Sequence, residues 1–267
     1  MLSLDSRIDP GKSIAYTQRQ PKFPQLNGKL PCRILSCGKS AAGKGVVLQN
    51  LMTRFFVDKS ERPCFDRYLI CSPTSKVDHS TWKPVREFME KLMGLSPEKI
   101  NGLFFDKWEP DKIEAEIAAH SKIVAQEKRD GKTVLSALLC VFDDMADQGG
   151  VMHKNNDSLI NRLYLSGRHH GISCIVVTQK LRLIAPAVRV NCSWAMFFRT
   201  ADRDEWDAMF SMFSALVDKP TFDQIWEHIH QQPYSFLSVF FHSQDPNRTF
   251  MERLEKWIDF SEDDTHS

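Results

Sequence analysis

The stretch CRILSCGKSAAGKG, residues 32–45, joins a short apolar run to a loop of small residues. An amphipathic run, GVVLQNLMTRFF, follows the loop at once. A strand, a glycine-containing loop with the spacing GxxxxGK and a helix, in this order, are typical of a phosphate-binding loop, or P-loop. A chance glycine turn is the alternative, but it would leave the flanking strand and helix patterns unexplained. We therefore take residues 38–45 as a candidate phosphate site.

The composition of this loop suits the binding of a phosphate group. Small side chains between Gly38 and Gly43 let backbone N–H groups curl around an anion, and the helix N-terminus adds a positive partial charge. Lys44 is placed to reach the β- and γ-phosphates of a nucleotide. The predicted nucleotide-binding residues are Gly38, Lys39, Ser40, Ala41, Ala42, Gly43, Lys44 and Gly45.

Gly45 departs from the P-loop pattern, which has Ser or Thr at this position. The hydroxyl of that Ser or Thr ligates Mg²⁺, so the glycine weakens the prediction of a metal site. Water can take the coordination position, because Mg²⁺ usually keeps several waters, and nucleotide can then still bind and turn over. Alternatively, the protein binds nucleotide and hydrolyses it poorly.

Two carboxylates follow the apolar run LLCVF of residues 138–142. In the presence of a P-loop, Asp143 is predicted to hold Mg²⁺ through water and Asp144 to polarise an attacking water. Alternatively, the two acids only mark the end of a strand and cap the next helix. The P-loop upstream favours the catalytic interpretation.

The next buried run, CIVVTQ of residues 174–179, also ends in polar side chains. In an open parallel sheet, ligands bind at the edge where the carboxyl ends of the strands lie. Gln179 is therefore predicted to donate to the γ-phosphate or to orient water. A glutamine at a strand end is also a common hydrogen-bonding residue of loops, and this alternative stays open.

Short apolar runs alternate with longer amphipathic ones along the chain. Strands are predicted over 32–37, 66–72, 134–144, 171–179, 194–199 and 235–242, with helices over 83–93, 111–129, 155–168 and 202–214. Continuous apolar strands alternating with helices predict an α/β fold with a mostly parallel sheet covered on both faces. We expect an irregular N-terminal arm over 1–30, a P-loop domain over 31–250, and a C-terminal helix and acidic tail over 251–267.

The composition is that of a globular protein, with 42% hydrophobic and 26% charged residues, and it excludes a disordered, collagen-like or coiled-coil chain. With 35 Lys+Arg against 34 Asp+Glu, no overall charge attracts nucleic acid. The sequence has no apolar run long enough to span a membrane and no signal peptide, so we expect a soluble protein. Seven scattered cysteines without CxxC spacing predict buried free thiols, a reducing compartment and no zinc site.

Four segments in the second half of the chain add a more specific signal. They are GRHHGIS of residues 167–173, CIVVTQ of residues 174–179, PAVRVN of residues 186–191, and the predicted strand that ends at Phe198 and Arg199. Together with the P-loop, they resemble the motor core of the FtsK–HerA superfamily of DNA translocases, which has a RecA-like P-loop fold. The chain is most similar to the poxvirus-type genome-packaging ATPases of double-stranded DNA viruses. The match covers about residues 30–245, including SPT of residues 72–74 and FFDKW of residues 104–108.

This resemblance implies an ATPase that drives double-stranded DNA into a preformed viral capsid, with ATP and Mg²⁺ as cofactors. It implies a homo-oligomeric ring, a hexamer or pentamer, with DNA in the channel and ATP at the subunit interfaces. An arginine of the neighbouring subunit would complete each site. Arg182 and Arg168 are the favoured candidates, ahead of Arg33 and Arg199.

The same resemblance implies capsid or inner-membrane packaging-vertex components as further partners. The expected location is the virion or the host-cell site of virus assembly, in the cytoplasm or a virus factory. The near-zero net charge agrees with such a motor if basic groups gather on one loop-bearing face.

Two other functions stay open from the sequence. A nucleotide-binding assembly or scaffold factor with weak or no hydrolysis would account for Gly45. A small-molecule kinase built on the same P-loop is the third possibility, and the absence of an obvious arginine-rich lid argues against it.

Overall fold

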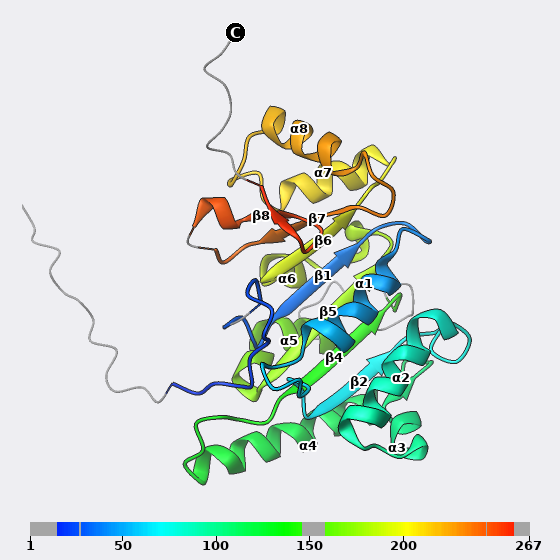
Figure 1. Cartoon of the computed structure of the whole chain (residues 1–267), viewed down its shortest axis with the longest axis vertical. Helices are drawn as coiled ribbons and strands as arrows, with labels where there is room; N and C mark the ends of the chain where they lie inside the picture. The colour runs from blue at the N-terminus through cyan, green and yellow to red at the C-terminus, as the bar shows by residue number, and fades with distance from the viewer. Residues whose placement is uncertain (1–14, 27, 146–157, 244, 259–267) are drawn as a thin grey trace, which may run out of the picture.

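A twisted sheet forms the centre of the computed structural model, which describes residues 15–26, 28–145, 158–243 and 245–258. In these residues the sheet has nine strands in the order β3-β2-β4-β5-β1-β6-β7-β8-β9 (Figure 1). The six strands from β3 to β6 in this order run parallel, and β7, β8 and β9 are added antiparallel. The strands are β1 Arg33–Cys37, β2 Arg67–Cys71, β3 Phe104–Phe105, β4 Leu138–Asp143, β5 Ile172–Thr178, β6 Trp194–Phe198, β7 Phe236–Phe240, β8 Phe250–Glu252 and β9 Lys256–Trp257.

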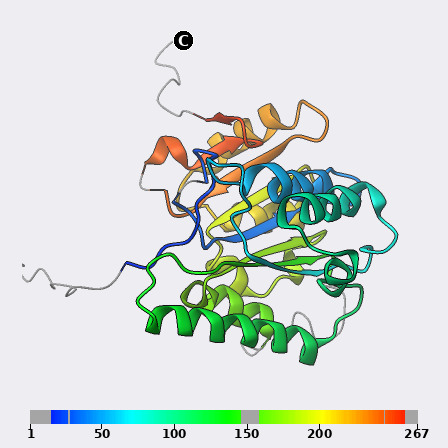
Figure 2. The ribbon, with the colours of Figure 1, turned by 60° about the horizontal axis from the view of Figure 1, so that its bottom comes forward.

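Helices cover the sheet on both faces. Figure 2 shows α1 and α2 on one side of the central strands and α4 on the other. The α-helices are α1 Lys44–Asn50, α2 His79–Met93, α3 Pro97–Gly102, α4 Pro110–Arg129, α5 Leu159–Ser166, α6 Pro186–Val190, α7 Arg203–Ser211 and α8 Lys219–Ile229. A π-helical turn, η1 Leu51–Phe55, continues α1, and the short 3-10 turns are η2 Gly167–His170, η3 Leu181–Leu183 and η4 Pro246–Arg248.

The alternation of side chains along β4 shows how the sequence forms two cores. Leu138, Cys140 and Phe142 are buried in the cluster that includes residues of α4, α5, α7 and α8. Leu139 and Val141 point the other way, into the cluster formed with α1, α2 and α3. Because both faces are covered, the strand is apolar throughout, as is typical of parallel sheets. The predicted α/β fold with a mostly parallel, doubly covered sheet is therefore confirmed.

Caps and prolines set where several helices begin. Asp78 precedes α2 and accepts a hydrogen bond from the backbone N–H of Thr81 at 3.1 Å. Pro110 and Pro186 are the first residues of α4 and α6, where the missing N–H costs no helical hydrogen bond. Each of these residues therefore marks the position at which its helix begins.

The predicted C-terminal helix is wrong for the part of residues 251–267 that the structure describes. Residues 250–252 and 256–257 form β8 and β9, and β8 pairs with β7. The apolar spacing in MERLEKWI resembles a helix, but Phe250, Met251 and Leu254 are buried because the hairpin extends the sheet. The predicted boundary at residue 250 thus falls inside a sheet strand, and residues 259–267 lie outside the described residues.

The N-terminal segment has no named strand or helix in residues 15–26 and 28–30, as expected for an irregular arm. It is nevertheless packed onto the domain, because the buried Gln18 donates a hydrogen bond to the carbonyl oxygen of Gly171 at 2.7 Å. The division at residue 30 stays a prediction.

All seven cysteines are buried free thiols. Among the helices that the structure describes, none combines the length and the apolar character needed to cross a membrane.

Replacing Gly171 with alanine should destabilise the fold more than replacing Gly131. Both glycines have φ in the left-handed region, at 68° and 76°, so alanine costs about 1–2 kcal/mol at either. At position 171 the added Cβ would also lie 2.6 Å from the carbonyl oxygen of Ser136, whereas at position 131 it meets no atom within 4 Å. We expect an additional loss of roughly 1–3 kcal/mol for Gly171→Ala in urea unfolding. Equal losses for the two variants would contradict this packing.

Candidate active site

The P-loop follows β1 and leads directly into α1. Gly43 is the N-cap of α1 with φ 101°, a conformation that favours glycine. The backbone N–H of Gly38 donates to the carbonyl oxygen of Thr178 at 3.1 Å, which joins the start of the loop to the end of β5. The strand, loop and helix predicted from residues 32–56 are therefore present in this order.

Lys44 lies inside the loop with its side chain buried. Its ammonium group donates to the carbonyl oxygens of Gly38 at 2.6 Å and Lys39 at 2.9 Å. Burial lowers the pKa of Lys44, while the charges of Asp144 and Asp143 raise it. The ammonium group is thus held at the loop by two uncharged carbonyl oxygens. An anionic ligand binds an ammonium group more strongly and can replace them.

Asp143 lies at the end of β4, next to the loop edge. Its carboxylate accepts a hydrogen bond from the Ser72 hydroxyl at 2.9 Å, and that hydroxyl lies 3.1 Å from the Thr74 hydroxyl. Burial raises the pKa of Asp143 to about 6, and the charge of Asp144 adds to this effect, while Ser72 and Lys44 oppose it. A poorly hydrated carboxylate of this kind gains free energy from a bound cation.

Asp144 and Gln179 are brought together by strands β4 and β5. The amide of Gln179 donates to the carboxylate of Asp144 at 2.9 Å. Asp144 has φ 48°, a left-handed conformation that few residues other than glycine adopt but that aspartate tolerates better than most, and its backbone N–H donates to the carbonyl oxygen of Val177 at 3.0 Å. The backbone therefore turns the Asp144 side chain away from the strand direction and toward the edge of the sheet that carries the P-loop.

A cavity of about 670 Å³ lies at this edge. This volume is within the range of small-molecule sites. Its walls come from the P-loop and α1 (Ser40, Ala41, Gly43, Lys44, Gly45, Val46, Val47), from the segment before and within α2 (Thr74, Asp78, Thr81), and from Asp143, Asp144 and Tyr234. Gln179 does not line the cavity directly and contacts it through Asp144.

The oxygen-bearing side chains of this cavity fit Mg²⁺. In the described parts of the chain no group of three or more His, Cys, Asp or Glu residues is arranged to hold a metal ion. Mg²⁺ in nucleotide sites, however, needs only one or two carboxylates besides water and phosphate oxygens. Asp143 with its neighbouring hydroxyls therefore offers a suitable donor set.

The structure does not bring the two favoured arginines to the cavity. Arg182 lies on η3, just after Gln179, and forms an exposed ion pair with Asp204 at 2.7 Å. Arg168 lies on η2, before β5, and therefore at the amino ends of the strands. The length of β5 separates it from the P-loop edge by on the order of 20 Å.

Asp78, Thr81 and Tyr234 are among the cavity residues that the sequence-based site predictions do not include. Tyr234 is 72% exposed and has φ 60°. Its ring reaches within 3.6 Å of the position that a Cβ on Gly43 would occupy. An aromatic side chain this exposed beside a P-loop offers a stacking surface for a nucleobase, yet its neighbours in the sequence give no signal of this.

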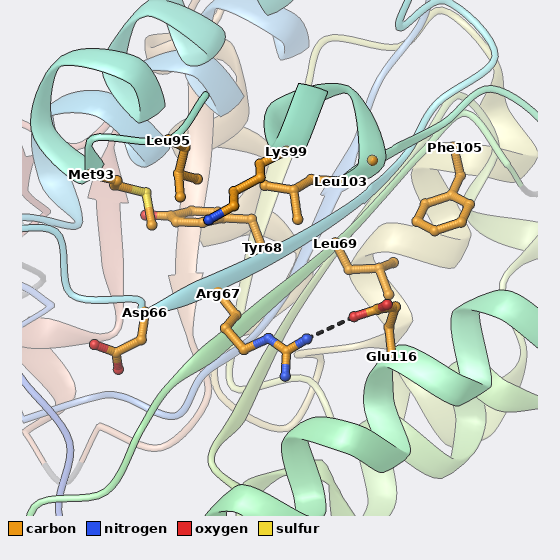
Figure 3. A pocket seen from close by; sticks show the side chains of 11 residues that line it. Asp66, Arg67, Tyr68, Leu69, Met93, Leu95, Lys99, Leu103, Phe105 and Glu116 are labelled. Atoms are coloured by element: carbon orange, nitrogen blue, oxygen red, sulfur yellow. Dashed lines mark hydrogen bonds and ion pairs between the residues drawn. The ribbon is translucent and has the colours of Figure 1, made fainter. Parts of the chain in front are cut away.

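A second hollow, of about 340 Å³, lies at the β2 side of the sheet between α3 and α4 (Figure 3). Arg67 and Glu116 face one another across it and form an ion pair at 2.7 Å. Its other walls are largely apolar, with Tyr68, Leu69 and Leu103 among them. This hollow has no phosphate-binding loop and no two neighbouring carboxylates. It is therefore a weaker candidate for an active site than the cavity at the P-loop.

Comparison with known structures identifies similar folds. The genome packaging NTPase B204 from Sulfolobus turreted icosahedral virus 2, in complex with AMP, matches with a TM-score of 0.55 and 14% identity, over 83% of this chain and 96% of that one. Its complex with AMPPCP gives a TM-score of 0.52 at 15% identity, over 83% and 97%. Its complex with ATP-gammaS gives 0.51 at 15% identity, over 84% and 97%.

These matches show a shared fold. No protein-family model matches the sequence, and no curated protein matches it at a significant level.

Replacing Asp143 with asparagine should raise the free energy of unfolding in metal-free buffer at pH 7. The folded chain raises the pKa of this carboxyl from 3.8 to about 6, so the ionised form is disfavoured by folding. Two pK units correspond to roughly 3 kcal/mol at most. The gain should be complete above pH 6 and should vanish toward pH 4, where the wild-type carboxyl is protonated in the fold.

Urea unfolding at a series of pH values, with a chelator present, measures this effect. An asparagine variant that is no more stable than the wild type at pH 7 would show that the Asp143 carboxylate is well solvated.

Proposed function

We propose that this chain is a P-loop ATPase that drives double-stranded DNA into a preformed viral capsid. The observation that carries the proposal is the convergence of Lys44, Asp143 and the Asp144–Gln179 pair at one edge of the sheet. A phosphate loop, a metal-holding carboxylate and a water-orienting pair are the parts that hydrolysis of a nucleoside triphosphate needs. A plain structural role would not account for two carboxylates and a buried ammonium at one cavity.

Each residue has a defined part in this proposal. The backbone of residues 38–45 holds the phosphates, and Lys44 exchanges its two carbonyl partners for phosphate oxygens. Asp143 holds Mg²⁺, which when bound neutralises charge on the β- and γ-phosphates. Asp144 accepts a proton from the attacking water, and Gln179 fixes the orientation of that carboxylate.

The similar fold of B204 supports both the binding of a nucleotide and a role in genome packaging. B204 is described as a genome packaging NTPase, and its structures contain AMP, AMPPCP or ATP-gammaS. The narrower assignment to the poxvirus-type ATPases of the FtsK–HerA superfamily rests on the sequence motifs. In this proposal the motor domain extends from about residue 31 through the β7–β9 hairpin, preceded by the N-terminal arm.

The active form in this proposal is a homo-oligomeric ring, a hexamer or pentamer, with ATP bound between subunits. An arginine from the neighbouring subunit then completes each site. Arg182 is exposed at the P-loop edge in an ion pair with Asp204, and such exposed pairs hold a side chain only weakly. Arg168 lies too far from its own P-loop, so it would act only on the site of a neighbour.

Four basic side chains gather at the opposite edge of the sheet. Burial, and then the charges of Arg33, Lys29 and Arg168, lower the pKa of His242. Burial and then the charge of Arg168 lower the pKa of Arg33, whose guanidinium donates to the carbonyl oxygen of Tyr164. The charged groups of Arg33, Lys29 and Arg168 can attract phosphates, whereas the lowered pKa of His242 favours its neutral form. These three charges support contact with the DNA backbone.

The partners in this proposal are double-stranded DNA, further copies of the chain, and capsid or inner-membrane packaging-vertex components. The site of action is the virion or the place of virus assembly in the host cell. These assignments follow from the packaging role.

A nucleotide-binding assembly or scaffold factor is the second candidate. The glycine at position 45 favours it, because the P-loop itself then lacks the hydroxyl that ligates Mg²⁺. Such a protein would bind ATP and hydrolyse it weakly or not at all.

ATP hydrolysis with and without double-stranded DNA tests the proposal directly. We expect turnover that DNA stimulates, and a loss of at least roughly 100-fold for Lys44→Ala, because the variant lacks the charge that stabilises the transferred phosphoryl group. Lys122→Ala, an exposed lysine on α4, is the matched control and should keep the wild-type rate.

Other outcomes of this experiment separate the candidates. ATP binding without turnover at any Mg²⁺ concentration supports the scaffold factor. Turnover that neither DNA nor Lys44→Ala changes would contradict both functions.

A further inference from the structure

The space beside Gly45 is already filled by a side chain from another helix. A Cβ at position 45 would lie 2.5 Å from the hydroxyl oxygen of Thr81, closer than non-bonded atoms approach. Thr81 belongs to α2, which packs alongside α1 (Figures 1 and 2). The hydroxyl missing from the P-loop position is therefore replaced in space by one from 36 residues further along the chain.

Several contacts fix Thr81 in this position. Its backbone N–H donates to the Asp78 cap at 3.1 Å, and the residue is only 5% exposed. The next residue, Trp82, is 1% exposed and packs its ring edge-on against Phe104, with centroids 5.7 Å apart. The first turn of α2 is thus anchored on both sides, and the rotation of the helix about its axis directs Thr81 toward α1.

Thr81 does more than fill the space. It lines the same cavity as Lys44 and Asp143, and Asp78 lines that cavity beside it. A hydroxyl oxygen is the type of group that the P-loop position normally offers to Mg²⁺. We propose that Thr81 takes over this task and, with Asp143, holds the Mg²⁺ of a bound magnesium–nucleotide, directly or through one water. This inference rests on the proposed nucleotide site and names the residue that completes it.

The short distance has a second consequence. A side chain at position 45 and the hydroxyl of Thr81 cannot occupy this space together. A serine or threonine at position 45 cannot fit while Thr81 keeps its place, because its Cβ would clash with the Thr81 hydroxyl. The glycine is then a requirement of this arrangement of α1 and α2, and a single exchange to the common P-loop residue should damage the site. Removing the Thr81 side chain beyond Cβ at the same time should repair it.

The affinity for a non-hydrolysable ATP analogue, measured by calorimetry with Mg²⁺ and with excess chelator, tests this inference without any readout of activity. In Thr81→Val, which lacks the hydroxyl, the gain in affinity from Mg²⁺ should fall by about tenfold or more. Thr81→Ser keeps the hydroxyl and should keep the gain. Affinity without Mg²⁺ should stay at the wild-type value in both variants.

A second pair of variants tests the exclusion. Gly45→Ser alone should lose the gain from Mg²⁺, and the double change Gly45→Ser with Thr81→Ala should recover it. Thr249→Val is the matched control, because Thr249 is 7% exposed and lies just before β8, outside the cavity. Thermal unfolding of each variant checks that the fold is intact.

The possible outcomes separate the proposed role of Thr81 from the proposed nucleotide site on which it rests. A wild type that binds the analogue, with Thr81→Val keeping the full gain from Mg²⁺, overturns the role of Thr81 alone. A wild type that binds no nucleotide under either condition overturns the proposed function together with this inference.

Discussion

The parallel pairing of β1, β5 and β4 is the constraint on which the rest of the structure depends. In this register Cys37 lies beside Thr178, and Asp143 lies beside Val177. The residues that follow these positions therefore emerge at one edge: the P-loop after β1, Gln179 after β5, and Asp144 after β4. A shift of one residue in either pair would turn the strand side chains to the opposite cores and separate the polar groups.

At this edge of the sheet the protein buries two ionisable side chains whose charged forms are more stable in water. Lys44 is buried and bonded to two backbone carbonyls, and Asp143 is a carboxyl whose pKa is raised by burial. Neither group has a full charged partner in contact among the described residues, so each gains from a ligand that brings the opposite charge. A triphosphate with a divalent cation supplies both. Burying these groups lowers the free energy of unfolding of the free chain. A bound nucleotide with its cation offsets this cost, so the same burial contributes to the binding affinity.

The sequence predicts those parts of the molecule that depend on neighbouring residues. The P-loop, the acidic pair and Gln179 each follow an apolar run, and the covered parallel sheet follows from the alternation of such runs with helices. Thr81 and Tyr234 were missed because they reach the cavity only through packing of segments distant in the sequence. The sequence does not predict the C-terminal hairpin, because the spacing of Met251 and Leu254 fits a helix. The segment forms a strand because β8 pairs with the edge of β7, a contact that the local sequence does not indicate.

The central claim is that the cavity at the P-loop edge binds a nucleoside triphosphate through Lys44. The structure of the chain bound to Mg²⁺ and a non-hydrolysable ATP analogue tests it most directly. In that structure we expect the Lys44 ammonium to leave the carbonyl oxygens of Gly38 and Lys39 and to contact the phosphates of the analogue. A structure with the analogue bound elsewhere, and Lys44 still bonded to both carbonyls, would contradict it.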